Sequence, residues 1–205
     1  MTRDQIKAIV FDLGKVLIEW DPRHLYRNIF ENTQKMEYFL STVCPPEWNL
    51  ELDRGYPFEE GVKDRIKLYP QYELEIRAYY LRWEEMVPGE IKTSVKLLSD
   101  LRRYPCSLYA LSNWSAETFP KMRQRFEFLK WFKKIFISGE IGLVKPEFAF
   151  YNYFLEKVKL KAPECIFIDD SALNIQTARK LGFKTILFES PEKLKEELRK
   201  NRVPV

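Results

Sequence analysis

Short apolar runs alternate with longer amphipathic segments along most of this chain. Five of the runs are rich in β-branched and aromatic residues, which is typical of strands that are buried on both faces. These runs are Ile6–Phe11, Ser107–Leu111, Ile135–Ile137, Cys165–Ile168 and Lys184–Phe188. Helical periodicity marks the segments Ile91–Arg103, Phe148–Val158, Ser171–Leu181 and the tail from Ser190. The alternation predicts an α/β fold in three layers, with a parallel sheet between two layers of helices.

The first connection departs from this regular spacing. About 95 residues separate the first two predicted strands, far more than a usual crossover contains. This stretch predicts helices at His24–Val43, Phe58–Leu68 and Gln71–Met86, divided by prolines and glycines. We therefore expect a core formed by residues 1–21 and 88–205, and an inserted helical subdomain formed by residues 22–87.

The composition indicates a globular protein rather than a disordered or nucleic-acid-binding one. The 205 residues are 45% hydrophobic and 31% charged, and the net charge is only +4. The densest basic stretch, residues 121–134, interleaves aromatic residues at helical spacing, which is typical of a solvated helix above core contacts. We expect no nucleic-acid partner, and the composition leaves a monomer and a homodimer both open.

Cysteine usage and the hydropathy pattern bear on the compartment. Cys44, Cys106 and Cys165 show neither a disulfide framework nor the spacing of zinc ligands, which favours a reducing compartment. The N-terminal residues lack the apolar segment of a secretion signal, and no run approaches the length of a membrane span. The sequence therefore predicts a cytoplasmic protein with no membrane partner.

Polar side chains follow several of the predicted strands. They are Asp12 after the first strand, Ser112 and Asn113 after the second, Lys145 in the loop after the third, and Asp169 and Asp170 after the fourth. Each alone fits an ordinary helix cap, turn or loop. Because the carboxyl ends of parallel strands meet at one edge of a sheet, we expect all of them to lie together.

The chemistry of such a cluster points to a phosphate site. Two carboxylates 4 Å apart repel each other by about 4 kcal/mol at an effective dielectric constant of about 20, so cations must offset them. Lys145 is one cation, and a set of oxygen ligands without His or Cys suits a hard divalent ion, most simply Mg²⁺. A hard cation, an ammonium group and hydroxyl and amide donors suit a phosphoryl group, which a carboxylate can attack.

Four segments resemble, in order, the motifs of the haloacid dehalogenase-like (HAD) superfamily. VFDLGKVL at residues 10–17 resembles its first motif, and LSN at residues 111–113 its second. Lys145-Pro146 resembles the third motif, and FIDDSALNIQTARKLG at residues 167–182 the fourth. The inserted helices resemble the cap that one branch carries after the first motif. The resemblance covers nearly the whole chain and implies a Rossmann-like core under a helical cap.

The resemblance also implies a Mg²⁺-dependent phosphatase acting on a small phosphorylated molecule. Asp12 would be the nucleophile that forms an aspartyl phosphate, and Lys145 would neutralise charge on Asp12 and the phosphoryl group. Ser112 and the Asn113 amide would hold phosphoryl oxygens. The metal would be held by Asp12, the Gly14 carbonyl, Asp170, and Asp169 directly or through water.

Gly14 is the largest departure from the family pattern. Most phosphatases of the superfamily have a second aspartate there, which protonates the leaving oxygen and contributes about 10²–10⁴-fold to the rate. The Asp-Leu-Gly-x-Val form resembles sugar-phosphate phosphatases of the glucose-1-phosphate type, which lack that aspartate. A metal-independent 2-haloacid dehalogenase and a weakly active phosphate-binding module are the alternatives.

Residues after the first motif are candidates for a substitute acid or for substrate contacts. Glu19, Asp21 and His24 could supply an acid, although His24 also fits a place in the first cap helix. The candidate substrate contacts on the cap side are Trp20, Arg23, Trp48 and Arg54.

Overall fold

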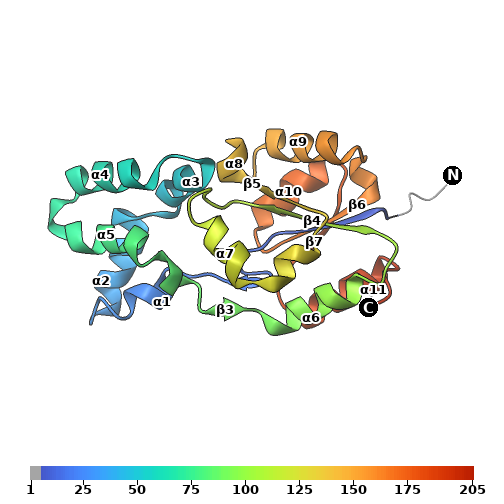
Figure 1. Ribbon diagram of the computed structural model, residues 1–205, viewed down its shortest axis with the longest axis horizontal. Helices are drawn as coiled ribbons and strands as arrows, with labels where there is room; N and C mark the ends of the chain where they lie inside the picture. Colours follow the sequence, from blue (N-terminus) through green and yellow to red (C-terminus); the bar gives the residue numbers. More distant parts are fainter. Residues whose placement is uncertain (1–5) are drawn as a thin grey trace.

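The computed structural model describes residues 6–205 and contains a five-stranded sheet in which all neighbouring strands are parallel (Figure 1). Its strands are β1 (Ala8–Phe11), β4 (Ser107–Ser112), β5 (Lys134–Ile137), β6 (Cys165–Asp169) and β7 (Lys184–Leu187). The order is β5-β4-β1-β6-β7, so the first strand lies at the centre. The sheet confirms the predicted α/β fold, and every predicted strand is present with its ends shifted by at most two residues.

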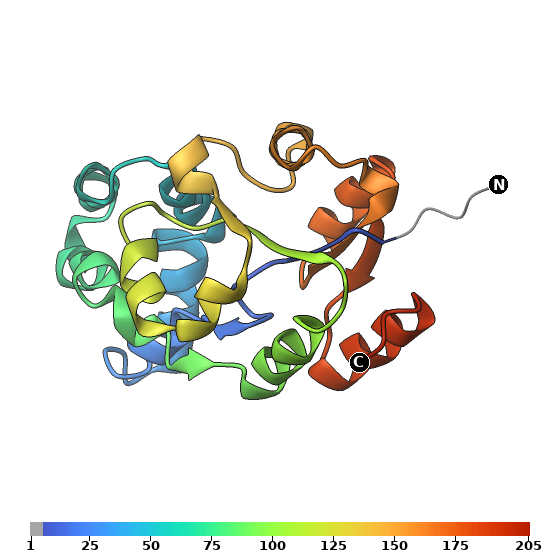
Figure 2. The same cartoon turned by 45° about the vertical axis from the view of Figure 1, so that its right-hand side comes forward.

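Helices cover both faces of this sheet (Figure 2). Alternate residues of β1 point to opposite sides, so Ile9 and Phe11 belong to one buried cluster and Ala8 and Val10 to another. The first cluster includes residues of α6 (Lys92–Leu101), α7 (Phe119–Arg125) and α11 (Pro191–Lys200). The second includes residues of α9 (Phe148–Val158) and α10 (Ala172–Lys180). The three layers follow directly from this two-sided burial.

Between β1 and β4 the chain forms a helical cap that extends from one end of the core (Figure 1). Its helices are α1 (Arg23–Tyr26), α2 (Thr33–Tyr38), the π-helix η1 (Phe39–Val43), α3 (Pro46–Arg54), α4 (Phe58–Leu68), the 3₁₀ turn η2 (Pro70–Tyr72), α5 (Glu73–Leu81) and the 3₁₀ turn η3 (Trp83–Met86). The chain passes between core and cap through β2 (Ile18–Glu19) and β3 (Gly89–Glu90), which pair antiparallel. This ribbon supports our proposal that the core comprises residues 1–21 and 88–205 and the cap residues 22–87, of which 1–5 lie outside the described residues.

The cap helices differ from the sequence prediction in two respects. The predicted single helix His24–Val43 is wrong, because a turn separates α1 from α2 and the Asn32 side chain caps α2 by accepting a hydrogen bond from Lys35 N at 3.1 Å. Gln71–Met86 likewise divides into α5 and two 3₁₀ turns. Helix α3 was not predicted, because Pro45-Pro46 indicated a break. Pro46 instead occupies the first helical turn, where a missing N–H costs little.

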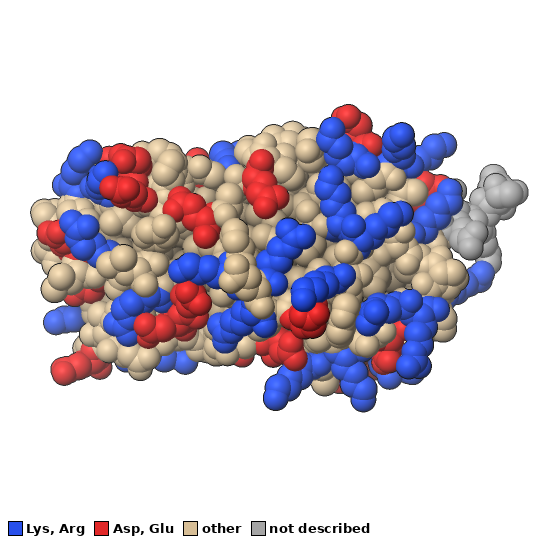
Figure 3. Space-filling model, in the orientation of Figure 1, with Lys and Arg blue, Asp and Glu red and all other residues tan. Residues whose placement is uncertain are grey.

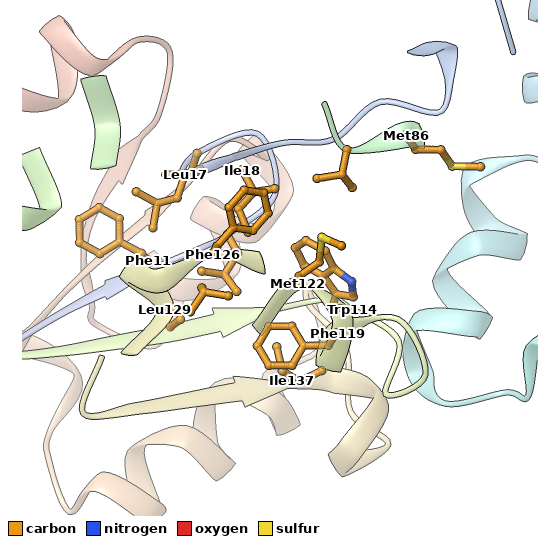
Figure 4. Close-up of a cluster of buried hydrophobic side chains, with 14 of the residues drawn as sticks. Phe11, Leu17, Ile18, Met86, Trp114, Phe119, Met122, Phe126, Leu129 and Ile137 are labelled. Atoms are coloured by element: carbon orange, nitrogen blue, oxygen red, sulfur yellow. The ribbon is translucent and has the colours of Figure 1, made fainter. Parts of the chain in front are cut away.

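Apolar side chains form a packed base beneath the loop that follows β4 (Figure 4). Leu17 from the first loop, Ile18 from β2, Met86 from the cap, and Trp114 and Phe119 after β4 are all buried there. The base therefore fixes the segment that follows Ser112 against both the core and the cap.

Charged side chains of both signs are interspersed on the face shown in Figure 3. The basic stretch 121–134 runs from within α7 through the 3₁₀ turn η4 (Glu127–Trp131) to the start of β5, and its residues Met122, Phe126 and Phe128 are buried. This confirms the expected solvated face above core contacts. In residues 6–205, no helix combines the length and apolar character that crossing a membrane requires.

Two further short elements flank strands of the core. Helix α8 (Ser138–Ile141) follows β5, and the 3₁₀ turn η5 (Ala162–Glu164) precedes β6. Helix α8 packs against α3 of the cap, so core and cap are in contact next to the carboxyl ends of the strands.

Candidate active site

Three neighbouring strands bring the predicted site residues together. Asp12 directly follows the central strand β1, and β4 and β6, which carry Ser112 and Asp169 at their carboxyl ends, pair with β1 on either side. Because Phe11 is in register with both Ala110 and Ile168, the residues that follow reach the same edge. The sheet thus places Asp12 between a hydroxyl and a second carboxylate.

Three donors surround one oxygen of the Asp12 carboxylate. Ser112 Oγ donates to Asp12 Oδ1 at 2.6 Å, and Leu13 N donates at 2.7 Å. Lys145 Nζ lies 3.0 Å from the same oxygen, and Asp12 is only 8% exposed. These contacts fix the orientation of the carboxylate and keep a positive charge beside it.

Asp169 holds the Lys145 ammonium group from the other side. Its Oδ2 lies 2.6 Å from Lys145 Nζ, and Ser171 N and Asn174 Nδ2 donate to Oδ1 at 2.8 and 2.9 Å. Burial disfavours the charged Lys145, but Asp12 and Asp169 outweigh it and hold the lysine pKa above its usual value. Burial raises the pKa of Asp169, and the Lys145 ammonium opposes that shift. Lys145 therefore stays protonated between two acids.

Asn113 positions the loop that carries Lys145. Its side-chain Nδ2 donates to Lys145 O at 2.9 Å, and Lys145 N donates to Asn113 Oδ1 at 2.8 Å. This pair of hydrogen bonds joins the loop after β4 to the loop before α9. The Asn113 side chain is thus engaged with the backbone of Lys145.

A group of three carboxylates at this edge could hold a divalent metal ion. Asp12, Asp169 and Asp170 each present an oxygen, and these oxygens lie within 4.8 Å of one another. Asp170 is half-buried, and burial raises its pKa, an effect that the charge of Asp12 increases. The donors are all oxygens, so they fit a hard cation such as Mg²⁺. Gly14 lines the same cavity.

The cavity at this edge has a volume of about 180 Å³ and lies between core and cap. Its lining from the core comprises Asp12, Gly14, Lys15, Ser112, Asn113, Trp114 and Asp170. The hinge and the cap contribute Trp20, Asn49, Asp53 and Trp83. The cavity therefore joins the acidic edge of the sheet to a wall that contains three tryptophans and one further acid.

The other sequence candidates, except Trp20, do not line this cavity in the described part of the chain. His24 Nε2 lies 3.2 Å from Glu19, and Asp21 accepts a hydrogen bond from Arg23 N at 2.9 Å. Arg23 also pairs with Glu37, Arg54 pairs with Glu147, and Trp48 packs against Tyr79. Of all these candidates within residues 6–205, Trp20 alone lines the cavity.

Sequence reasoning missed four residues of the cavity wall: Asn49, Asp53, Trp83 and Trp114. Asn49 and Asp53 are on α3, the helix that was not predicted. Their spacing of four residues, which places both on one face of a helix, is the signal that could have indicated them.

A parallel sheet with aspartates at its strand ends and a helical cap inserted after the first strand defines a capped hydrolase core of the HAD type. The sequence profile of haloacid dehalogenase-like hydrolases matches residues 9–188. The chain belongs to this family, and it is therefore a hydrolase of the HAD type.

Relatives of known name share between a quarter and a third of their aligned residues with this chain. Drimenol cyclase drtB of Aspergillus calidoustus is 26% identical over 198 residues, which are 94% of this chain and 36% of the cyclase. Sesquiterpene phosphatase astK of Aspergillus oryzae is 27% identical over 86% of both chains. This chain thus spans about a third of the cyclase but most of the phosphatase.

Solved structures show the same fold. A HAD family enzyme of Bacteroides thetaiotaomicron, in complex with magnesium and inorganic phosphate, has a TM-score of 0.70 at 25% identity, covering 90% of this chain and 94% of that one. L-2-haloacid dehalogenase of Xanthobacter autotrophicus has a TM-score of 0.64 at 16% identity, covering 98% and 85%. The second likeness concerns the fold alone.

Proposed function

We propose that this protein is a Mg²⁺-dependent phosphatase that hydrolyses the phosphate monoester of a small molecule through a phosphorylated Asp12. The observation that carries the proposal is the contact of Lys145 Nζ with Asp12 at 3.0 Å and with Asp169 at 2.6 Å. A carboxylate oriented in this way beside a cation can attack a phosphoryl group, because the ammonium charge offsets the repulsion between the two anions.

Each residue at the sheet edge has a part in this reaction. Asp12 forms the bond to phosphorus, and the Ser112 hydroxyl and Asn113 amide donate hydrogen bonds to the phosphoryl oxygens. Lys145 stabilises the charge that the transition state spreads over those oxygens. Asp169 and Asn174 position Lys145 through the hydrogen bonds described above.

Mg²⁺ fits the ligands that this edge presents. We propose that Asp12, Asp170 and the Gly14 carbonyl bind it, and that Asp169, whose oxygens already accept other hydrogen bonds, assists through water. The ion, when bound, would neutralise charge on the phosphoryl group. The magnesium and phosphate complex of the Bacteroides enzyme supports this assignment.

The cavity wall bears on the class of substrate. Trp20, Trp83 and Trp114 offer aromatic faces, whereas Asn49 and Asp53 offer polar groups. The name of the Aspergillus oryzae relative, a sesquiterpene phosphatase, supports a substrate with an apolar body. The sugar phosphate that the first motif indicated also fits, since sugar rings pack on aromatic faces and their hydroxyls bond to polar groups. We therefore propose that the substrate is a small phosphate monoester, either of a terpenoid alcohol or of a sugar.

Hydrolysis of nitrophenyl phosphate tests the proposal, with release of inorganic phosphate measured with and without a chelator. We expect activity that needs Mg²⁺ and that Asp12→Asn abolishes, whereas Asp100→Asn, at an exposed position on α6, leaves it intact. A panel of sugar phosphates and terpenoid monophosphates then ranks substrates. Hydrolysis that survives chelation or Asp12→Asn would contradict the mechanism, and metal-independent halide release from 2-haloacids would support a dehalogenase instead.

A further inference from the structure

The site described above lacks an acid for the leaving group, and the cap carries a carboxyl group that lines the same cavity. Asp53 lines the same cavity as Asp12, Ser112 and Asp170. Gly14, where many family phosphatases have their acid, has no side chain. Asp53 therefore brings a carboxyl group of the cap into the cavity that would hold the leaving part of a substrate bound at Asp12.

Hydrogen bonds hold the Asp53 carboxyl in place. Asn49 Nδ2, one helical turn earlier on α3, donates to Asp53 Oδ2 at 2.8 Å, and the backbone N–H of Ser115 also donates to this carboxyl. Tyr79 OH donates to Asn49 Oδ1 at 2.8 Å, which fixes the amide with its NH₂ group toward Asp53. The carboxyl is thus oriented by the cap and by the core loop after β4.

The helix that carries Asp53 is attached to the core beside the site. The Ser138 hydroxyl donates to Asp53 O and accepts from Trp114 N at 2.8 Å. Gly139 N donates to Trp114 O at 3.0 Å. A Cβ on Gly139 would lie 2.4 Å from Ala116 N, so glycine is needed for this close approach. Arg54, next to Asp53, pairs with Glu147 of the core at 2.7 Å. These contacts place Asp53 relative to the sheet edge.

The surroundings of Asp53 favour a protonated carboxyl near neutrality. Burial raises the pKa of Asp53 to about 7, the Ser115 and Asn49 donors oppose that shift, and the negative charge of Asp12 adds to it. The other charged groups that line the cavity are Lys15 and Asp170. Asp53 also lies in the last turn of α3, where the helix dipole disfavours negative charge. The group can therefore both donate and accept a proton.

We infer that Asp53 is the general acid and base of this enzyme, in place of the aspartate that Gly14 lacks. This inference rests on the proposed function. As Asp12 bonds to phosphorus and the ester P–O bond breaks, Asp53 gives its proton to the leaving oxygen and the alcohol departs. Asp53, now a carboxylate, takes a proton from water while the water oxygen attacks phosphorus. The bond from phosphorus to Asp12 breaks, inorganic phosphate leaves, and Asp53 is protonated again.

Asp53→Asn and a series of monoesters with different leaving groups test this role. An alkyl phosphate needs the proton, so we expect Asp53→Asn to lower its kcat/KM by about 10²–10⁴-fold. Nitrophenyl phosphate has a stable leaving anion, so its kcat/KM should change by less than about 10-fold. Its kcat should still fall, with a burst of nitrophenol and an accumulated phosphoenzyme, because water is no longer activated. Asp64→Asn, on the exposed surface of the cap, is the matched control and should behave as wild type.

The outcomes separate the role of Asp53 from the phosphatase activity itself. Equal losses of kcat/KM on both kinds of ester would show that Asp53 only supports the structure, and no loss on the alkyl ester would also overturn the inference. In both cases the proposed function stands if the wild type hydrolyses the esters and Asp12→Asn does not. A wild type without hydrolysis on any ester would overturn both. A carbon-13 NMR titration of the Asp53 carboxyl adds a readout without turnover: we expect a midpoint near neutrality, and one near the usual value of about 3.9 would contradict the role.

Discussion

Lys145 and Asp169 form an ion pair that is closed off from solvent: the Nζ–Oδ2 distance is 2.6 Å, and the side chains are 1% and 0% exposed. Charges in such a place are stable only as a pair, since each has lost its hydration. The pair therefore links the chemistry of the site to the stability of the fold. The same ammonium contacts Asp12 at 3.0 Å, so its position is set by two strands at once.

The buried pair predicts a large cost when one partner is removed. We expect Asp169→Ala to lower the free energy of unfolding by about 3–5 kcal/mol, because Lys145 would lose a buried counter-charge. Glu197→Ala breaks the exposed pair with Lys200 and should cost far less, because both groups stay hydrated. Urea unfolding of both variants measures the difference. An equal decrease in the free energy of unfolding would show that the buried pair stabilises the fold no more than the exposed one.

Metal binding predicts a stabilisation that needs no substrate. A ligand at about 100 times its Kd that binds only the folded state adds about 2.7 kcal/mol, which is roughly 5–10 °C in Tm for a chain of this size. We expect Mg²⁺ to raise the Tm of the wild type and of Asp64→Asn but not that of Asp170→Asn. Differential scanning fluorimetry across a magnesium titration measures the shifts. A shift retained in Asp170→Asn would remove this residue from the ligand set.

The sheet and its polar edge could be predicted from the sequence because both depend on local patterns. Short runs such as Ala8–Phe11 are apolar at every position and end at a polar residue, and parallel strands bring those ends together. Asp53 could not be found in this way. Its helix begins at the second of two prolines, and its place in the cavity depends on how α3 docks on α8, a tertiary contact that the spacing of Asn49 and Asp53 alone does not reveal.

Asp53 also predicts a pH dependence of stability. Its pKa is about 7 in the folded state, above the usual value of about 3.9 for the unfolded chain, so the folded state binds the proton more tightly. The stabilisation from this group is complete below about pH 4 and is lost as the pH rises through about 7. We expect the free energy of unfolding of the wild type, relative to that of Asp53→Asn, to decrease as the pH rises from about 4 to about 7. Urea unfolding at a series of pH values measures it, and a constant difference would contradict the shifted pKa.

Gly14 offers a direct way to exchange one acid for another. A Cβ built on Gly14 meets no atom within 4 Å, and its backbone φ is not in the left-handed region, so a side chain fits there without strain. We expect Gly14→Asp, introduced into Asp53→Asn, to restore kcat/KM for an alkyl phosphate by at least about 10-fold, because it returns an acid to the position that most family phosphatases use. Gly14→Ala in the same background supplies a Cβ without the carboxyl and should restore nothing. Steady-state kinetics of the two double variants, after circular dichroism has shown that both are folded, measures the effect. Equal activity of the two double variants would show that the loss of activity in Asp53→Asn does not come from the loss of a proton donor.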